Sequence, residues 1–193
     1  MIIMRKFLKI LLLSMICCLG FAASAHCEVI SYPVPDGDVR MNPDYVVRVC
    51  DEGKNNWKTV PVYGARSVEI PVWGNGASLD VGLAYFDMSG PVTVEITTKR
   101  EGEQVFNIRP EESVEFEQIG KTVRFTLTEP KKLSVELNGN RHTNLMLYAN
   151  PIENYRLMED TRHIIYIGPG LHTKDNCAYI NQDYQIRIPS NTI

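Results

Sequence analysis

Close pairs of acidic side chains are the first candidates for catalytic residues in this chain. Three such pairs are Asp36/Asp38, Glu111/Glu112 and Glu159/Asp160. Two carboxyl groups held roughly 5 Å or 6.5–9.5 Å apart can hydrolyse a glycosidic bond, one as the acid and the other as nucleophile or base. Each pair here lies in a turn or a polar loop, where a solvated charge is the ordinary outcome. We therefore predict no catalytic residue in this chain.

Metal and cofactor sites are not predicted either. Asp36 and Asp38 flank a glycine, but calcium needs six to eight oxygen ligands and this stretch lacks the spaced acids of a dedicated loop. His142, His163 and His172 do not have the spacing of metal ligands. For the last two we expect a packing or hydrogen-bonding role.

Two other patterns that would indicate chemistry are incomplete. The Gly168-Pro169-Gly170 stretch lacks the Lys-Ser/Thr pair and the following helix of a phosphate-binding loop, and it is predicted to be a turn. No Gly-x-Ser-x-Gly elbow accompanies the serines, histidines and aspartates.

Aromatic side chains are the remaining candidates for ligand contact. Flat apolar ring faces suit pyranose rings, and Trp57, Trp73, Tyr63 and Tyr85 are the residues that could form such a platform. Trp73 has the opposite parity to the apolar series that precedes it, which favours an outward position. We single out Trp57 and Trp73 as candidate carbohydrate-binding residues, with packing inside the fold as the alternative.

The N-terminus is predicted to be a secretion signal, residues 1–25. Arg5, Lys6 and Lys9 precede an apolar run from Ile10 to Ala23, and the sequence Ala-Ser-Ala then provides a small-x-small cleavage site. The run is short for a membrane span of about twenty residues, so no transmembrane segment is expected. We predict an exported protein, periplasmic or extracellular, with a lipid anchor on Cys27 as the alternative.

Charge and cysteine content restrict the partners and the scaffold. Of the 20 basic residues three lie in the signal, which leaves 17 against 23 acidic residues. This balance argues against nucleic acid as a partner, because phosphate binding needs clustered positive charge. Cys27, Cys50 and Cys177 are too few for a disulfide-built fold. Either Cys50 and Cys177 form one bridge, or the thiols stay free.

Alternation of apolar and polar residues predicts an all-β protein. It is clearest where Val123, Phe125 and Leu127 alternate with polar residues, and it recurs in 68–72, 79–85, 92–97 and 133–137. Turn signals such as Asn138-Gly139 separate these runs at intervals near ten residues, and no window has convincing helical periodicity. About ten short strands with this spacing predict an immunoglobulin-like antiparallel β-sandwich.

A boundary is expected near residues 154–162, after a sandwich that covers 26–154. The stretch 151–161 is polar and predicted to be a connecting loop. Beyond it, the continuous apolar run 164–167 is typical of a strand covered on both sides. We interpret 155–193 as a linker and the truncated start of a parallel β-helix; the alternative is a central strand of the same sandwich.

Three stretches of the chain carry a family resemblance: LSVELNG (133–139), Asn144-Leu145 followed by LYANPIE (147–153), and IIYIGPGLH (164–172). They resemble the N-terminal β-sandwich module of secreted β-helix glycoside hydrolases, of the polygalacturonase and dextranase type (families 28 and 49). In such enzymes the catalytic domain is a right-handed parallel β-helix. The Asp, His and Arg-x-Lys elements of family 28 have no match here, so the resemblance transfers no catalytic residue.

What the resemblance implies is a role as a non-catalytic accessory domain of a polysaccharide-degrading enzyme. Its expected partners are a β-helix catalytic domain and a polysaccharide. The alternatives are a free-standing carbohydrate-binding module and a surface-adhesion domain.

Overall fold

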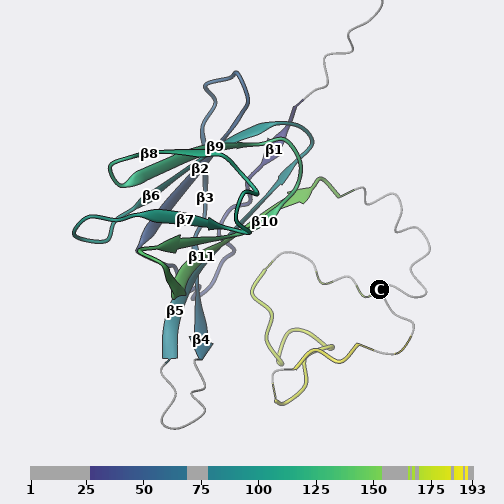
Figure 1. Ribbon diagram of the computed structural model, residues 1–193. Coiled ribbons are helices and arrows are strands. Elements are labelled where there is room, and N and C mark those ends of the chain that lie inside the picture. Colours follow the sequence, from purple (N-terminus) through teal and green to yellow (C-terminus); the bar gives the residue numbers. More distant parts are fainter. Residues whose placement is uncertain are drawn as a thin grey trace, which may run out of the picture.

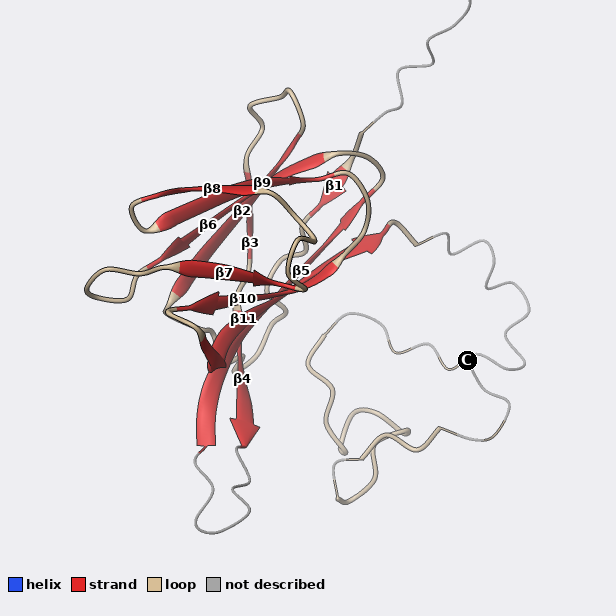
Figure 2. Cartoon of the chain, viewed as in Figure 1, coloured by secondary structure: helices blue, strands red, loops and turns tan. Residues whose placement is uncertain are grey.

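The computed structural model of the protein shows two β-sheets and no helix among the residues that it describes (Figure 1, Figure 2). Those residues are 27–68, 78–153, 165, 167, 170–183, 185–188 and 190. The prediction of an all-β protein is therefore confirmed. The predicted signal (1–25) and the predicted boundary (154–162) lie outside the described residues.

The first sheet has six strands. In spatial order five of them run β1-β5-β11-β10-β7, and the sixth, β4, also pairs with β5. Their bounds are β1 Val29–Ile30, β4 Tyr63–Val68, β5 Ser78–Met88, β7 Phe106–Arg109, β10 Lys132–Leu137 and β11 Asn140–Pro151.

The second sheet has five strands in the order β3-β2-β6-β9-β8. Their bounds are β2 Tyr45–Asp51, β3 Lys58–Val60, β6 Val92–Thr98, β8 Phe116–Ile119 and β9 Thr122–Leu127. Buried side chains from both sheets form one hydrophobic cluster, so the sheets pack face to face as a sandwich.

Period-two alternation predicts the buried face of most strands correctly. Val123, Phe125 and Leu127 of β9 are buried in the core while the residues between them are exposed. The β10–β11 hairpin also forms where predicted, with Asn138 and Gly139 at φ of 53° and 69°. Two successive positive φ angles are those of a tight hairpin turn, which favours the Asn-Gly pair.

Strand β5 is an exception to the predicted burial. Its core face carries Ala84, Phe86 and Met88, whereas the apolar series that ends at Leu83 and Tyr85 points away from the core cluster. Both faces of this strand are rich in apolar residues, so alternation alone does not identify the buried one. The outward series forms part of the site described below.

The prediction of a wholly antiparallel sandwich is wrong for one strand pair. β11 pairs with β5 in parallel, and the other strand pairs that the structure describes are antiparallel. The chain that connects these strands crosses to the second sheet and back, which gives the long connection that a parallel pair needs. Residue patterns within single strands hold no information on this choice.

Inside the sandwich the parallel pair places large side chains beside small ones. Leu145 lies next to Gly82, Leu147 next to Ala84, and Ala149 next to Phe86. A Cβ atom added at Gly82 would lie 3.0 Å from a methyl carbon of Leu145. The register is therefore fixed by complementary volume as well as by hydrogen bonds.

The described part of the C-terminal segment folds into turns. Ile180 and Ile186 form one antiparallel bridge, and the Asn181 amide donates to the Gln185 carbonyl at 3.0 Å. Of the apolar run 164–167 only Ile165 and Ile167 are described, both half-buried. The predicted start of a β-helix therefore stays a prediction.

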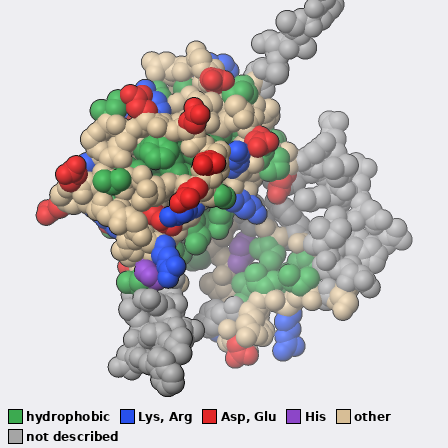
Figure 3. Space-filling view, viewed as in Figure 1, with side chains coloured by type: hydrophobic (Ala, Val, Ile, Leu, Met, Phe, Trp, Pro, Cys, Tyr) green, Lys and Arg blue, Asp and Glu red, His purple; other side chains and the backbone are tan. Residues whose placement is uncertain are grey.

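Surface and cysteine features complete the fold. Among the residues that the structure describes, no helix has the length and apolar character needed to cross a bilayer. Acidic and basic side chains are interspersed over the sandwich on the face shown in Figure 3.

Cys27, Cys50 and Cys177 are free thiols, so the Cys50–Cys177 bridge is absent. Cys50 instead lies buried in β2, with its thiol 3.0 Å from the Lys54 carbonyl.

Candidate functional site

The outer face of the six-stranded sheet carries a row of tyrosines. Tyr63 of β4 lies opposite Leu83 of β5, and Tyr85 is two residues further along β5 on the same face. Tyr148 of β11 lies beside Tyr85 in the parallel register. Three neighbouring strands thus bring tyrosines from distant parts of the sequence to one surface.

Three of these rings contact one another. The Tyr63 and Tyr85 rings are stacked, with centroids 5.8 Å apart and an interplanar angle of 14°. The ring of Tyr32, from the segment after β1, has its centroid 5.9 Å from that of Tyr85, and the two ring planes are tilted by 31°. These contacts join the three rings into a tyrosine row (Tyr32, Tyr85, Tyr63), with Tyr85 in the middle.

The tyrosine row forms the floor of an open groove of about 900 Å³. The walls come from the 32–39 segment, the end of β11 and the C-terminal segment. The described residues that line it are Tyr32, Pro33, Pro35, Asp36, Val39, Tyr63, Leu83, Tyr85, Asp87, Asn150, Glu153, Ile167, Gly170 and Leu171. The volume is in the range of sites for small ligands, and the mixture of aromatic, apolar and a few polar groups is typical of them.

Polar groups gather at one end of the groove. Asp87 is 7% exposed and its carboxylate accepts a hydrogen bond from the Tyr32 hydroxyl. Asn150 lies beside Asp87 in the parallel register, and Glu153 follows β11 on the exposed rim. Asp87 therefore orients the first ring of the tyrosine row, and Asn150 lines the groove beside it.

The Tyr63 hydroxyl is buried without a hydrogen-bond partner of ordinary geometry among the described residues. Burial, together with the neighbouring Tyr85, raises the pKa of Tyr63 to about 12. A buried hydroxyl that lacks a partner costs about 1–3 kcal/mol. The ring of Tyr63 thus contributes packing, whereas its hydroxyl group opposes folding.

Tyr63→Phe is accordingly expected to raise the free energy of unfolding by about 1 kcal/mol, because it removes the unpaired hydroxyl and keeps the ring. Urea unfolding followed by fluorescence measures this change. Tyr32→Phe is the matched control and should destabilise, since it removes the hydrogen bond to Asp87. A loss of stability in Tyr63→Phe comparable to that of the control would contradict the assignment.

The structure does not bring the four aromatic residues of the predicted sugar-binding platform to one surface. It brings Tyr63 and Tyr85 together, and it places Trp57 just before β3 of the other sheet. Trp73 lies outside the described residues. The Trp57 ring is half-buried beneath two guanidinium groups, with the Arg48 and Arg124 carbons 5.1 and 5.7 Å from a ring centroid. Its contact with a saccharide stays a prediction.

Tyr32 is the member of the tyrosine row that sequence reasoning missed as a ligand-contacting residue. It precedes the Pro33-Val34-Pro35 stretch, outside any alternating run. Proline-rich extended segments commonly run along the edge of a sheet rather than inside it. That preference is a sequence signal that could have placed Tyr32 beside an outer face.

The acidic pairs do not form a catalytic arrangement in the part of the chain that is described. Asp36 and Asp38 lie in an exposed bend, Glu111 and Glu112 are exposed, and Glu159/Asp160 are outside the described residues. No group of three or more histidine, cysteine or acidic side chains suited to a metal ion occurs among the described residues.

Two carboxylates elsewhere in the sandwich are held as anions. Burial of Glu95 by itself would raise its pKa, but hydrogen bonds from Arg124 and Arg48 outweigh burial and lower it. The pKa of Asp51 is lowered in the same way by Asn56 and Lys54. A general acid needs the opposite shift, so neither group is suited to donate a proton near neutral pH.

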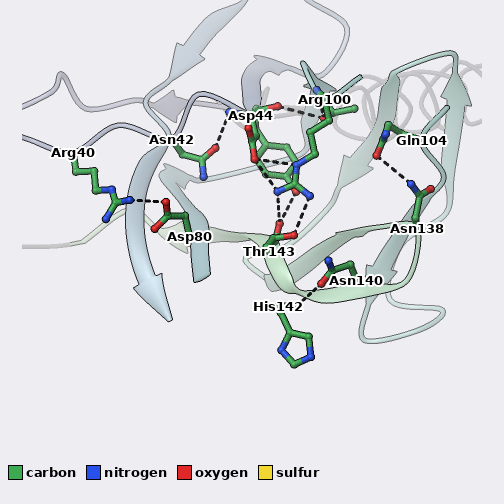
Figure 4. A network of polar contacts seen from close by, with 12 residues as sticks. Arg40, Asn42, Asp44, Asp80, Arg100, Gln104, Asn138, Asn140, His142 and Thr143 are labelled. Carbon is green, nitrogen blue, oxygen red and sulfur yellow. Dashed lines mark hydrogen bonds and ion pairs between the residues drawn. The ribbon is translucent and has the colours of Figure 1, made fainter. Parts of the chain in front are cut away.

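A polar cluster closes one end of the sandwich (Figure 4). Arg100 donates to the Asp44 carboxylate at 2.7 and 2.9 Å and to the Thr143 hydroxyl at 2.9 Å. Tyr45 lies under the guanidinium group and donates its hydroxyl to the Thr143 carbonyl at 3.0 Å. These contacts join the segment after β6 to β2 and β11, which indicates a structural role.

Neither of the described histidines in question, His142 and His172, is a lining residue, although the His172 Nε2 atom lies 3.8 Å from where a Cβ atom at Gly170 would be. His142 comes directly before Thr143 in β11, and its backbone amide donates to the Asn140 side chain at 2.9 Å (Figure 4). His172 follows the last lining residue, and His163 is outside the described residues. None of them is placed by the described contacts in a metal site.

Comparison with known proteins gives likenesses to solved structures alone. No protein-family model matches the chain, and no curated protein matches it either. The chain is similar to the structure of Dex49A from Penicillium minioluteum, with 19% sequence identity and a TM-score of 0.48. The match covers 72% of this chain and 35% of that protein, so the chain spans about a third of its length. No residue role is transferred from it.

Proposed function

We propose that this protein is a non-catalytic, polysaccharide-binding β-sandwich module that binds its ligand in the tyrosine-lined groove. The observation that carries the proposal is the tyrosine row on the outer face of a rigid sheet. Aromatic faces stack on the apolar C–H faces of sugar rings, and rigid tyrosines lose little conformational entropy when they do so.

The polar groups of the groove fit the same kind of ligand. A saccharide presents hydroxyl groups around an apolar ring, so it needs hydrogen-bond partners at the edge of the stacking surface. Asp87 and Asn150 supply acceptors and donors at one end of the tyrosine row. The strands that hold these residues form the centre of the sheet, which keeps the surface pre-organised.

The module is further proposed to be the accessory domain of a secreted glycoside hydrolase. The support for this part is the resemblance of residues 133–139, 147–153 and 164–172 to the N-terminal module of β-helix hydrolases. An immunoglobulin-like sandwich, export from the cell, and a β-helix catalytic domain as the partner belong to this proposal. The lowered pKa values of Glu95 and Asp51 agree with a module that contributes no proton transfer.

Binding of soluble polysaccharides by the purified protein tests the proposal. Affinity electrophoresis in gels that contain dextran, a galactan or polygalacturonate should show retardation by at least one polymer. Tyr85→Ala should weaken that binding at least about tenfold, because it removes the middle ring of the row and about 1.4 kcal/mol of stacking. The same incubations should release no reducing sugar.

Tyr179→Ala is the matched control, since Tyr179 is 44% exposed and lies outside the groove lining. It should bind as the unaltered protein does, and circular dichroism should show both variants folded. Failure to bind any of the polymers, or equal weakening by both substitutions, would reject the proposed function.

A further inference from the structure

Among the described residues that line the groove, the charged side chains are all acidic. Asp36, Asp87 and Glu153 are among the lining residues, and no lysine, arginine or histidine is among those described. The three carboxylates come from different parts of the fold: the 32–39 segment, β5 and the residues after β11. The negative charge is therefore distributed around the tyrosine row and not confined to one rim.

Two basic side chains on elements next to the groove have partners elsewhere. Lys132 of β10 stands over the Tyr148 ring, at 5.9 Å from its centroid, and Tyr148 is not a lining residue. Arg40, in the segment that follows the groove wall, is paired with Asp80 at 2.5 Å. The predicted mature chain is itself acidic, with 23 acidic and 17 basic residues, which extends the repulsion of anions beyond the groove.

From these observations we infer that the groove selects uncharged polysaccharides and rejects polyuronates. The inference rests on the proposed function and specifies the chemical class of its ligand. A carboxylate on each sugar ring would have to lie among the three lining carboxylates, and the described lining residues offer it no cationic side chain. Like charges brought together in this way repel. A neutral glucan has no such cost and keeps the stacking on the tyrosines.

The inference is tested by comparing the affinity of the protein for a neutral and for an anionic polysaccharide. Dextran is the neutral probe and polygalacturonate the anionic one, each titrated against the purified protein at about 20 mM and 1 M salt. At low salt we expect dextran to bind at least about tenfold more tightly than polygalacturonate. At 1 M salt, where the screening length is about 3 Å, this ratio should shrink.

Reversing the rim charge should reverse the discrimination. Asp36 and Glu153 are exposed residues of the groove lining and lie outside the hydrophobic core, so Asp36→Lys/Glu153→Lys should fold normally. We expect polygalacturonate binding to strengthen at least about tenfold at low salt, while dextran binding changes less than about twofold. Glu101→Lys/Glu103→Lys, on the exposed loop between β6 and β7, makes the same change in net charge outside the groove. This control should leave both affinities unchanged.

The outcomes separate the inference from the function on which it depends. Equal or tighter binding of polygalacturonate by the unaltered protein, or an equal gain in the control variant, would overturn the inference and leave saccharide binding in place. Binding of neither polymer by any variant would overturn both.

Discussion

Phe86→Ala is expected to lower the free energy of unfolding by about 3–5 kcal/mol, the largest effect of any single substitution discussed for this protein. Phe86 is fully buried on the core face of β5, where it faces the second sheet. Truncation would leave a cavity that a rigid β-sandwich fills poorly. For a domain of this size the melting temperature should fall by roughly 10 °C.

The position of Phe86 in the parallel pair of β5 and β11 allows a double-mutant test. Ala149 of β11 lies directly beside it on the same face. Ala149→Phe alone should destabilise by about 1–3 kcal/mol, because it adds a ring to a filled core. In the double variant the new ring can occupy part of the cavity left by Phe86, so the combined loss should be smaller than the sum of the single losses.

Denaturant unfolding of the four proteins in this cycle measures the coupling between the two sites. Ile119→Ala, at a residue that is 71% exposed on β8, is the control for loss of an apolar side chain and should change stability by less than about 0.5 kcal/mol. Strictly additive losses would contradict the parallel register of β5 and β11. That register also places Tyr85 beside Tyr148 and Asp87 beside Asn150, so the same experiment examines the scaffold of the groove.

The class of fold is predictable from the sequence because the alternation of buried and exposed residues is a pattern among neighbouring positions. Where one face of a strand is apolar and the other polar, as in Thr122–Leu127, alternation identifies the strand and its buried side. The Asn138-Gly139 turn is equally local, because positive φ at two successive residues favours that pair. Each of these features depends on neighbours within a few positions of the chain.

The groove depends on features that are not local. Tyr63 and Tyr85 were recognisable as flat rings, but their contact arises from the pairing of β4 with β5, and the addition of Tyr32 from a segment outside the strands. The parallel pairing of β11 with β5 brings Asn150 beside Asp87 across more than sixty residues of sequence. Strand β5 is apolar on both faces, so its outward side is visible only once the second sheet is in place.

Alkaline pH is expected to destabilise the protein through Tyr45. This residue is 3% exposed, and burial raises its pKa to about 12 although the neighbouring Arg100 opposes the shift. In the unfolded chain the phenol has a pKa near 10, so the unfolded state loses its proton first as the pH rises. The stabilising contribution is therefore complete below about pH 10 and is lost between about pH 10 and pH 12.

The size of this loss follows from the two pKa values. A difference of about two units corresponds to about 2.7 kcal/mol above pH 12 and to about half of that at pH 11. Unfolding by urea at pH 8, 10 and 11 measures it by comparison of the unaltered protein with Tyr45→Phe. The variant should lose about 1 kcal/mol at pH 8, where the hydrogen bond to the Thr143 carbonyl is absent.

The gap between the two proteins should then narrow as the pH rises, because phenylalanine has no proton to lose. Tyr179→Phe, at an exposed tyrosine, should show the same alkaline loss as the unaltered protein. A gap between Tyr45→Phe and the unaltered protein that stays constant from pH 8 to pH 11 would contradict a raised pKa at Tyr45. Because Tyr45 reaches across the end of the sandwich to β11, the alkaline loss also reports how firmly the clamp of Arg100, Asp44 and Thr143 holds the two sheets together.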